Sequence, residues 1–359
     1  KYAKSATFYH WAKWMFTCTF IFEGILLYCA YRSLVSGTIS LAEMTIMTSV
    51  MTSAAWGLIN AFNAIMAVHS EGIYIQNARE FLSYEEKIPE DKDGISAPAK
   101  IESIEFRNVT FTYAGEESPT IKNMSFKLTN GTSAAFVGHN GAGKTTLIKL
   151  LFRLYDADSG EILLNGVNIR EFNLNSNRKM FSAAFQDYQV IAMSLLDNIT
   201  MGTEIENERD TALSVIDKVG LKDKVSSLKN GLDTIMTREF DDEGAVFSGG
   251  QYQKLAVARA LAQNGECMVF DEPSSALDPI AEYDLFQTIM AETRNKTMIF
   301  ISHRLSSVKA ADEIFMMEQG KIIEHGTHSQ LIQKNGKYAN MFRHQAKSYL
   351  AQTDNEEVL

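Results

Sequence analysis

Hydrophobic residues form two long stretches near the start of the chain, and both are almost free of charge. Met15–Tyr31 contains Glu23 as its one charged side chain, and Met44–Val68 contains none. About 20 apolar residues are enough for a helix to cross the hydrocarbon core of a bilayer. The pattern therefore predicts two transmembrane helices, at about residues 14–35 and 44–68, within a membrane region formed by residues 1–75.

Basic residues around these stretches predict the orientation of the two helices. Lys1, Lys4 and Lys13 precede the first stretch, whereas Arg32 is the basic residue of the short connection between the two. Lys and Arg favour the cytoplasmic side of a membrane. We therefore expect a multi-pass protein of the cell membrane, with both ends of the hairpin in the cytoplasm and the connection outside.

Two polar features inside the stretches are candidate functional residues. Glu23 lies within the first predicted helix, where an ionisable side chain is costly and often functional. A carboxylate there can also be protonated or paired with another helix, so the sequence leaves its role open. The second predicted helix has a polar face that either lines a transport path or packs by hydrogen bonding: Thr45, Ser49, Thr52, Trp56, Asn60 and Asn63.

After the membrane region the pattern changes to short elements. Residues 76–100 are rich in charge and contain two of the five prolines, which predicts a linker. Apolar and polar residues then alternate over residues 104–113, as in β-strands. Apolar runs separated by helical stretches predict a largely parallel α/β sheet within residues 101–345, and the runs are Ser133–Val137, Cys267–Phe270 and Met298–Ile301. Residues 346–359 are expected to form a C-terminal tail.

Composition and charge exclude several classes of protein. The chain has 359 residues, which suggests about two domains, and its 45% apolar residues and three cysteines exclude a disordered or disulfide-stapled chain. The formal net charge is −10, with +2 on residues 1–68 and −12 on the remainder. An acidic body repels a phosphate backbone, so we expect no nucleic-acid partner.

A phosphate-binding motif, the P-loop, follows the run Ser133–Val137. It matches the pattern G-x-x-x-x-G-K-[ST], and its residues are Gly138, His139, Asn140, Gly141, Ala142, Gly143, Lys144 and Thr145. The glycines allow backbone N–H groups to surround phosphates at the start of a helix, to which Thr146 also belongs. Lys144 is predicted to neutralise the β- and γ-phosphates, and Thr145 to bind Mg²⁺ through its hydroxyl.

A second candidate element is the apolar run that leads into Asp271 and Glu272. A strand that delivers an aspartate beside the P-loop can hold Mg²⁺, and a following glutamate can accept the proton of an attacking water. The sequence therefore predicts Asp271 as a metal residue and Glu272 as the general base.

Between these two motifs lies a third, Phe247-Ser248-Gly249-Gly250-Gln251, and with it the chain resembles the ATPases of ABC transporters. The resemblance implies an α/β P-loop ATPase domain of ABC type with a helical signature subdomain, preceded by an all-α transmembrane hairpin. It implies that ATP is the nucleotide and that Tyr113 stacks on adenine. Gln186, which would also lie near the metal, and His303 are implied to assist catalysis. The residues implied to contact ATP bound by a partner chain are Ser248, Gly249, Gly250, Gln251 and Asp278.

The membrane region also resembles that of exporters, in which helices precede the ATPase on one chain. Such exporters carry six spans per half, so we expect this sequence to be part of a longer half-transporter, with four spans before residue 1. The resemblance implies ATP-driven movement of a peptide, lipid or drug-like substrate, and a second half-transporter, identical or different, as partner. Two alternatives are a soluble ABC ATPase of repair or translation and a non-hydrolysing regulatory subunit. The apolar hairpin and the acidic remainder of the chain argue against the first, and Glu272, His303, Gln186 and the intact third motif argue against the second.

Overall fold

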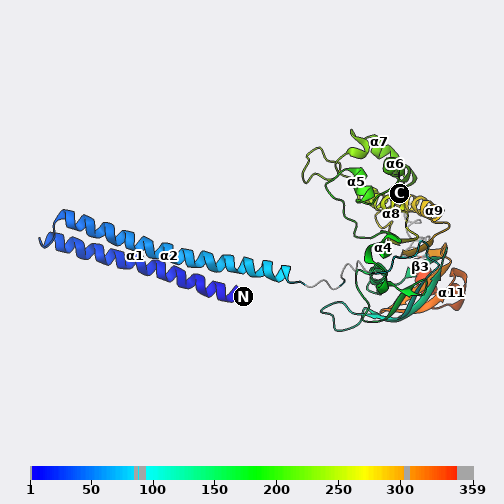
Figure 1. Ribbon diagram of the computed structural model, residues 1–359, viewed down its shortest axis with the longest axis horizontal. Helices are drawn as coiled ribbons and strands as arrows, with labels where there is room; N and C mark the ends of the chain where they lie inside the picture. Colours follow the sequence, from blue (N-terminus) through cyan, green and yellow to red (C-terminus); the bar gives the residue numbers. More distant parts are fainter. Residues whose placement is uncertain (1, 85–87, 89–93, 303–307, 346–359) are drawn as a thin grey trace, which may run out of the picture. The chain divides into compact units, whose positions relative to one another are not determined.

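The computed structural model describes residues 2–84, 88, 94–302 and 308–345. Within it the chain divides into two compact units, Lys1–Lys87 and Ile88–Leu359 (Figure 1). The first unit is entirely α-helical, and the second combines sheets with helices. The change of hydrophobic pattern along the sequence therefore coincides with a change of structural class.

The first unit is a hairpin of two long helices, α1 (Tyr2–Val35) and α2 (Leu41–Leu82), which lie side by side (Figure 1). The connecting turn contains Gly37 at φ 70°, a left-handed conformation that favours glycine. Ser40 caps α2: the Ser40 hydroxyl accepts from the Glu43 N–H at 3.3 Å, and the Glu43 carboxylate accepts from the Ser40 N–H at 2.7 Å. This reciprocal cap explains where the second helix begins.

Both helices are long and apolar enough to cross a membrane, over Thr17–Val35 and within Leu41–Leu82. Their apolar side chains are largely exposed within the unit, with Leu58 at 72%. A core helix of a soluble protein buries such residues, so the exposure favours a lipid or protein environment outside this hairpin. α2 continues past the predicted span into the predicted linker because residues there, such as Arg79 and Glu80, are good helix formers.

The centre of the second unit is a six-stranded sheet with the order β10-β9-β3-β8-β7-β6. Its strands are β3 (Ser133–Val137), β6 (Phe181–Ala184), β7 (Cys267–Asp271), β8 (Thr297–Ile301), β9 (Glu313–Glu318) and β10 (Lys321–Gly326). All neighbouring strands are parallel except β9 and β10, which form an antiparallel pair. The expected largely parallel α/β sheet is thus confirmed.

A second, antiparallel sheet has the order β2-β1-β4-β5. Its strands are β1 (Ser103–Phe111), β2 (Ile121–Thr129), β4 (Ser159–Leu164) and β5 (Val167–Asn168). The sequence pattern indicated the first of these strands, but its partners come from segments whose alternation is weaker. The pairing of β1 with both β2 and β4 depends on long-range contacts that periodicity does not contain.

Helices cover the six-stranded sheet. The α-helices that the structure describes in the second unit are α3 (Lys144–Leu151), α4 (Leu174–Lys179), α5 (Leu195–Thr200), α6 (Glu208–Lys218), α7 (Lys222–Ser226), α8 (Gly249–Gln263), α9 (Pro279–Glu292) and α11 (His328–Lys334). Short 3₁₀ helices lie at Ile169–Glu171 and Gly231–Asp233. The successive residues Phe136 and Val137 of β3 belong to two different hydrophobic clusters. One cluster joins the sheet to α3 and the antiparallel sheet, and the other joins it to α5, α6, α8 and α9. The sheet is therefore buried on both faces, as its apolar runs require.

Helices α5, α6, α7 and α8 pack against one another and form a helical region of the second unit (Figure 1). α8 begins directly after Ser248, so this region carries the third motif of the sequence. The expected helical subdomain is confirmed.

Candidate functional site

The P-loop connects the end of β3 to the start of α3. Gly138 has φ 151°, and a Cβ there would lie 2.2 Å from the carbonyl oxygen of Met317 in β9. Gly143, at φ 99°, occupies the N-cap position of α3. A side chain at either position would collide or strain the backbone, so both glycines are required for this turn. The turn leaves the N-terminus of α3, with its free N–H groups, at the end of the parallel sheet.

Lys144 supplies the positive charge of this loop. It is 7% exposed, and its ammonium donates to the carbonyl oxygens of Gly138 at 2.9 Å and His139 at 3.1 Å. Burial lowers the pKa of Lys144, while the nearby carboxylates of Glu272 and Asp271 act in the opposite direction. The loop therefore holds a largely desolvated cation, which is suited to a phosphate group.

Asp271 at the end of β7 lies next to the P-loop. The Thr145 hydroxyl donates to Asp271 Oδ2 at 2.8 Å, although the two residues are 126 positions apart. Burial raises the pKa of Asp271, and the Thr145 hydrogen bond opposes this shift. Among the described atoms, Asp271 Oδ1 is buried and has no hydrogen-bond partner. A hydroxyl beside an orphaned carboxylate oxygen is a donor set that fits Mg²⁺.

Glu272 and Gln186 line the same cavity as the P-loop. The cavity has a volume of about 240 Å³, and its lining residues are Thr120, Asn140, Gly141, Gly143, Lys144, Thr145, Thr146, Gln186 and Glu272. Glu272 has φ 49°, a conformation uncommon for a side chain of its kind, and its N–H donates to the carbonyl oxygen of Ile301 at 3.0 Å. The fold therefore holds the backbone of Glu272 in a strained conformation at the cavity.

Tyr113 is connected to the cavity without lining it. Its hydroxyl lies 3.1 Å from the hydroxyl of Thr146, which does line it. Its ring makes edge contacts with Phe111 and Tyr155, and the Lys149 ammonium lies 5.9 Å from the ring centroid. The tyrosine is thus held beside the start of α3 by an aromatic cluster.

The third motif begins α8. The Ser248 hydroxyl accepts from the Gln251 N–H at 3.3 Å, and Gln251 Oε1 accepts from the Ser248 N–H at 2.9 Å. A Cβ on Gly250 would lie 2.8 Å from a methyl group of Leu277 and 3.3 Å from the carbonyl oxygen of Ala276, so a larger residue would require the Leu277 side chain to shift. Phe247 is buried in the core, as its apolar character predicts. The two polar motif residues therefore first serve to cap their own helix.

Asp278 is the N-cap of α9. Its Oδ1 accepts from the N–H groups of Ile280 at 3.0 Å and Ala281 at 2.9 Å, which lower the pKa of Asp278. The structure does not bring Asp278 or the residues of the third motif, Ser248, Gly249, Gly250 and Gln251, to the lining of the P-loop cavity. His303, a candidate from the sequence, lies outside the described residues.

Two functional candidates escaped the sequence analysis. Thr120 lines the cavity from the loop before β2, and no pattern in the sequence points to it. Gln253 in α8 is 4% exposed, and its amide bonds the Ser275 hydroxyl at 2.5 Å and the Ala276 N–H at 2.8 Å. The available signal was a glutamine among the buried positions of α8, which are otherwise apolar. Through these two hydrogen bonds, Gln253 connects α8, which begins with the third motif, to the loop that follows Glu272.

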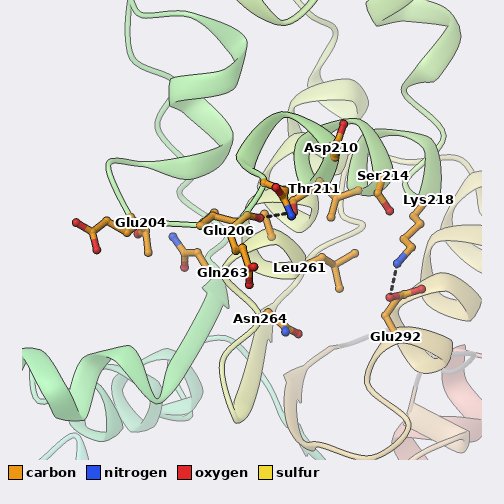
Figure 2. Close-up of a pocket in the computed structure, with 15 residues that line it drawn as sticks. Glu204, Glu206, Asp210, Thr211, Ser214, Lys218, Leu261, Gln263, Asn264 and Glu292 are labelled. Atoms are coloured by element: carbon orange, nitrogen blue, oxygen red, sulfur yellow. Dashed lines mark hydrogen bonds and ion pairs between the residues drawn. The ribbon is translucent and has the colours of Figure 1, made fainter.

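A second cavity, of about 750 Å³, lies among the 203–218 segment, the end of α8 and Glu292 (Figure 2). Figure 2 shows the carboxylates of Glu204, Glu206 and Asp210 around it, and Lys218 paired with Glu292 at 2.7 Å. No residue of the three motifs lines this cavity. The chemistry of the lining, not its volume, therefore identifies the smaller P-loop cavity as the candidate site.

Comparisons with known proteins show which family the chain is similar to. Residues 121–275 match the family model described as ABC transporter. The chain is 40% identical over 281 residues to the subtilin transport ATP-binding protein SpaT of Bacillus subtilis, covering 77% of this chain and 45% of the relative. It is 38% identical over 239 residues to the ATP-dependent lipid A-core flippase of Haemophilus ducreyi, covering 67% of this chain and 40% of the relative.

Among solved structures, a bacterial Atm1-family ABC exporter with ATP bound matches with a TM-score of 0.70 and 27% sequence identity. The match covers 86% of this chain and 53% of that one. The chain thus spans about half the length, or less, of the relatives that it matches.

Proposed function

This chain contains an ATP-binding domain of the ABC transporter family, and from this premise we propose that it is the ATP-hydrolysing part of an exporter. In this proposal, ATP binding and hydrolysis drive the movement of a substrate across the membrane that α1 and α2 help to span. The observation that carries it is the convergence of Lys144, Thr145, Gln186 and Glu272 on one cavity beside Asp271.

In this proposal, the residues at this cavity have different roles in binding and hydrolysing ATP. Thr145, Asp271 and Gln186 would hold Mg²⁺, which when bound neutralises charge on the phosphate oxygens. Lys144 binds and orients the phosphates, together with the N–H groups at the start of α3. Glu272 accepts a proton from the attacking water, since a carboxylate fixed at the cavity wall can align that water with the phosphate.

A second half-transporter is part of the proposal. The third motif and Asp278 do not line the P-loop cavity of their own chain, and they present a helix N-terminus and small residues. This separation supports a shared site, in which Ser248, Gly249, Gly250, Gln251 and Asp278 of one chain face ATP bound by its partner. Closing two such sites would convert binding energy into movement of the membrane helices.

The orientation of the chain follows from its charges. The basic residues before the first span and the sparse charge of the turn support a cytoplasmic ATPase domain and an external turn between α1 and α2.

The substrate class supported by the family is broad and includes peptides, lipids and drug-like molecules. Tyr113, Asn140, Gly141 and Thr146 complete the proposed ATP contacts.

Glu272→Gln tests the hydrolytic role directly. The full-length protein is purified in nanodiscs, and ATP hydrolysis, ATP binding and ATP-dependent substrate uptake into inverted vesicles are measured. Loss of a general base lowers the rate by about 10²–10⁴-fold, while the amide keeps the shape of the side chain and therefore ATP binding. Glu266→Gln, just before the opposite end of β7, is the matched control and should hydrolyse normally. Hydrolysis by Glu272→Gln within a few-fold of wild type contradicts the assignment, and hydrolysis without any transport contradicts the exporter.

A further inference from the structure

Glu23 has a specific partner within the helical hairpin. The Thr52 hydroxyl donates to Glu23 Oε1 at 2.9 Å, which joins α1 to α2 across 29 positions of sequence. Trp14 and Val35 bound the predicted first span, and Glu23 lies about 14 Å and about 18 Å from them along the helix at 1.5 Å per residue. The carboxylate is therefore near the middle of the predicted span and is turned toward the second helix.

Thr52 lies at the border between two stripes of α2. One stripe, half-buried in the hairpin, packs toward α1 and consists of Met44, Thr48, Met51, Ala55, Ile59, Phe62 and Met66. The other is exposed and polar, and consists of Thr45, Ser49, Thr52, Trp56, Asn60 and Asn63. The hairpin thus places Glu23 at the edge of a polar stripe that α1 does not cover, not in the centre of the contact between the two helices.

Among the side chains of the hairpin that the structure describes, none supplies a compensating cation to Glu23. The contact that the structure shows for the Glu23 carboxylate is the hydrogen bond from Thr52. Arg32, the one basic residue of the 14–68 segment, is about 14 Å further along α1 at 1.5 Å per residue. Burying an ionised, uncompensated carboxylate in hydrocarbon is expensive, so an ionised Glu23 requires this edge to face protein or water.

Trp56 adds the second group expected of a site for cations. It lies one turn after Thr52 on the exposed stripe, and its side chain is 53% exposed. An indole face attracts ammonium groups, and a neighbouring carboxylate adds charge-assisted hydrogen bonding. Carboxylate, hydroxyl and indole on one surface of the hairpin are therefore complementary to an organic cation.

We propose that Glu23 and Thr52, with Trp56, form a binding site for an ammonium group of the transported molecule. This inference rests on the proposed export function and adds to it the chemical class of the substrate. Thr52 orients the carboxylate by donating to one of its oxygens, and the carboxylate contacts the cation. The polar stripe of α2 then lines the path of the substrate.

Binding of matched charged and neutral probes to the full-length protein in nanodiscs tests the proposal. One pair is dodecylammonium and dodecanol, and the other is a hydrophobic peptide containing a lysine and the same peptide with norleucine in its place. Glu23→Gln should weaken binding of a charged probe by about tenfold or more, as expected for loss of a charge-assisted hydrogen bond, and change its neutral counterpart by less than about twofold. Glu23→Asp, which keeps the charge, should recover part of the affinity. Glu43→Gln, a carboxylate that caps α2, should leave both affinities unchanged.

Each outcome is informative. A loss confined to the lysine peptide supports the site and identifies a peptide as the source of the cation, and a loss confined to dodecylammonium identifies a small amphiphile. An equal loss of charged and neutral probes indicates a packing role and overturns the proposal, as does equal binding of charged and neutral probes by the wild type. Failure of the proposed function is seen separately, as absence of ATP hydrolysis by the wild-type protein, because probe binding is measured without ATP.

Discussion

Gln253 couples the third motif to the loop between Glu272 and Asp278, and its replacement by Met tests this connection. Methionine has nearly the same length and fills the same buried space, but it cannot bond the Ser275 hydroxyl or accept from the Ala276 N–H. Each lost hydrogen bond contributes about 1 kcal/mol to stability, so the free energy of unfolding should fall by about 2 kcal/mol. At about 2–4 °C per kcal/mol for a domain of this size, Tm should fall by about 4–8 °C.

The same substitution should also slow ATP hydrolysis. The loop would lose its link to α8, and Glu272 at its start would be less firmly placed at the cavity. We therefore expect kcat for ATP hydrolysis to fall by about tenfold or more with little change in KM, because a misplaced base affects the reacting geometry more than nucleotide binding.

Thermal unfolding followed by circular dichroism and steady-state ATP hydrolysis check both expectations in the full-length protein. Gln263→Met makes the same substitution at the end of the same helix and controls for the chemistry of the side chain. A Tm within about 1 °C of wild type, together with an unchanged kcat, would refute the reasoning from these two hydrogen bonds.

Three further predictions concern topology, assembly and pH. In a cysteine-free background, a cysteine at Ser36 should react with an impermeant maleimide on intact cells and one at Ser96 should not, since the positive-inside rule places the turn outside. Labelling of the cysteine at Ser96 alone would contradict this topology. If the partner is a second copy, mixing Lys144→Ala chains with Ser248→Arg chains should restore one intact shared site and measurable hydrolysis, whereas full activity of a monomer would contradict a shared site. Burial, assisted by a nearby lysine, lowers the pKa of His328 below its ordinary value of 6.5. The unfolded chain therefore binds more protons as pH falls below this value, so stability decreases with acidification, and His328→Gln should lose less Tm than wild type between about pH 7.5 and pH 5.5.

Local pattern was sufficient for much of the architecture. The two apolar stretches predicted the hairpin because a membrane-spanning helix satisfies its backbone within one continuous segment. The P-loop was recognisable because its turn, its phosphate-facing N–H groups and Lys144 belong to one short run after a buried strand. The wholly apolar runs indicated parallel strands, because a sheet covered on both faces buries every position of a strand.

The antiparallel sheet shows where local pattern was insufficient. β1 pairs with β2 on one side and β4 on the other, and the register of each pair is set by contacts between segments distant in sequence. A shift of the register by one residue would move every side chain of a strand to the opposite face of the sheet. The sequence of a single strand does not indicate which neighbouring strand sets its register.

The sequence by itself predicted most of the residues proposed to carry chemistry, and the tertiary structure decided which atoms meet. The motif order indicated that Asp271 belongs with the P-loop, but only the fold shows that Thr145 occupies one carboxylate oxygen and leaves the other without a partner. Likewise, the polar residues of the hairpin were visible from their spacing, whereas the bond between Glu23 and Thr52 depends on the rotation of each helix about its axis. Such pairings involve residues far apart in the chain, and their geometry is fixed by the packing of many apolar side chains at once, which no local pattern encodes.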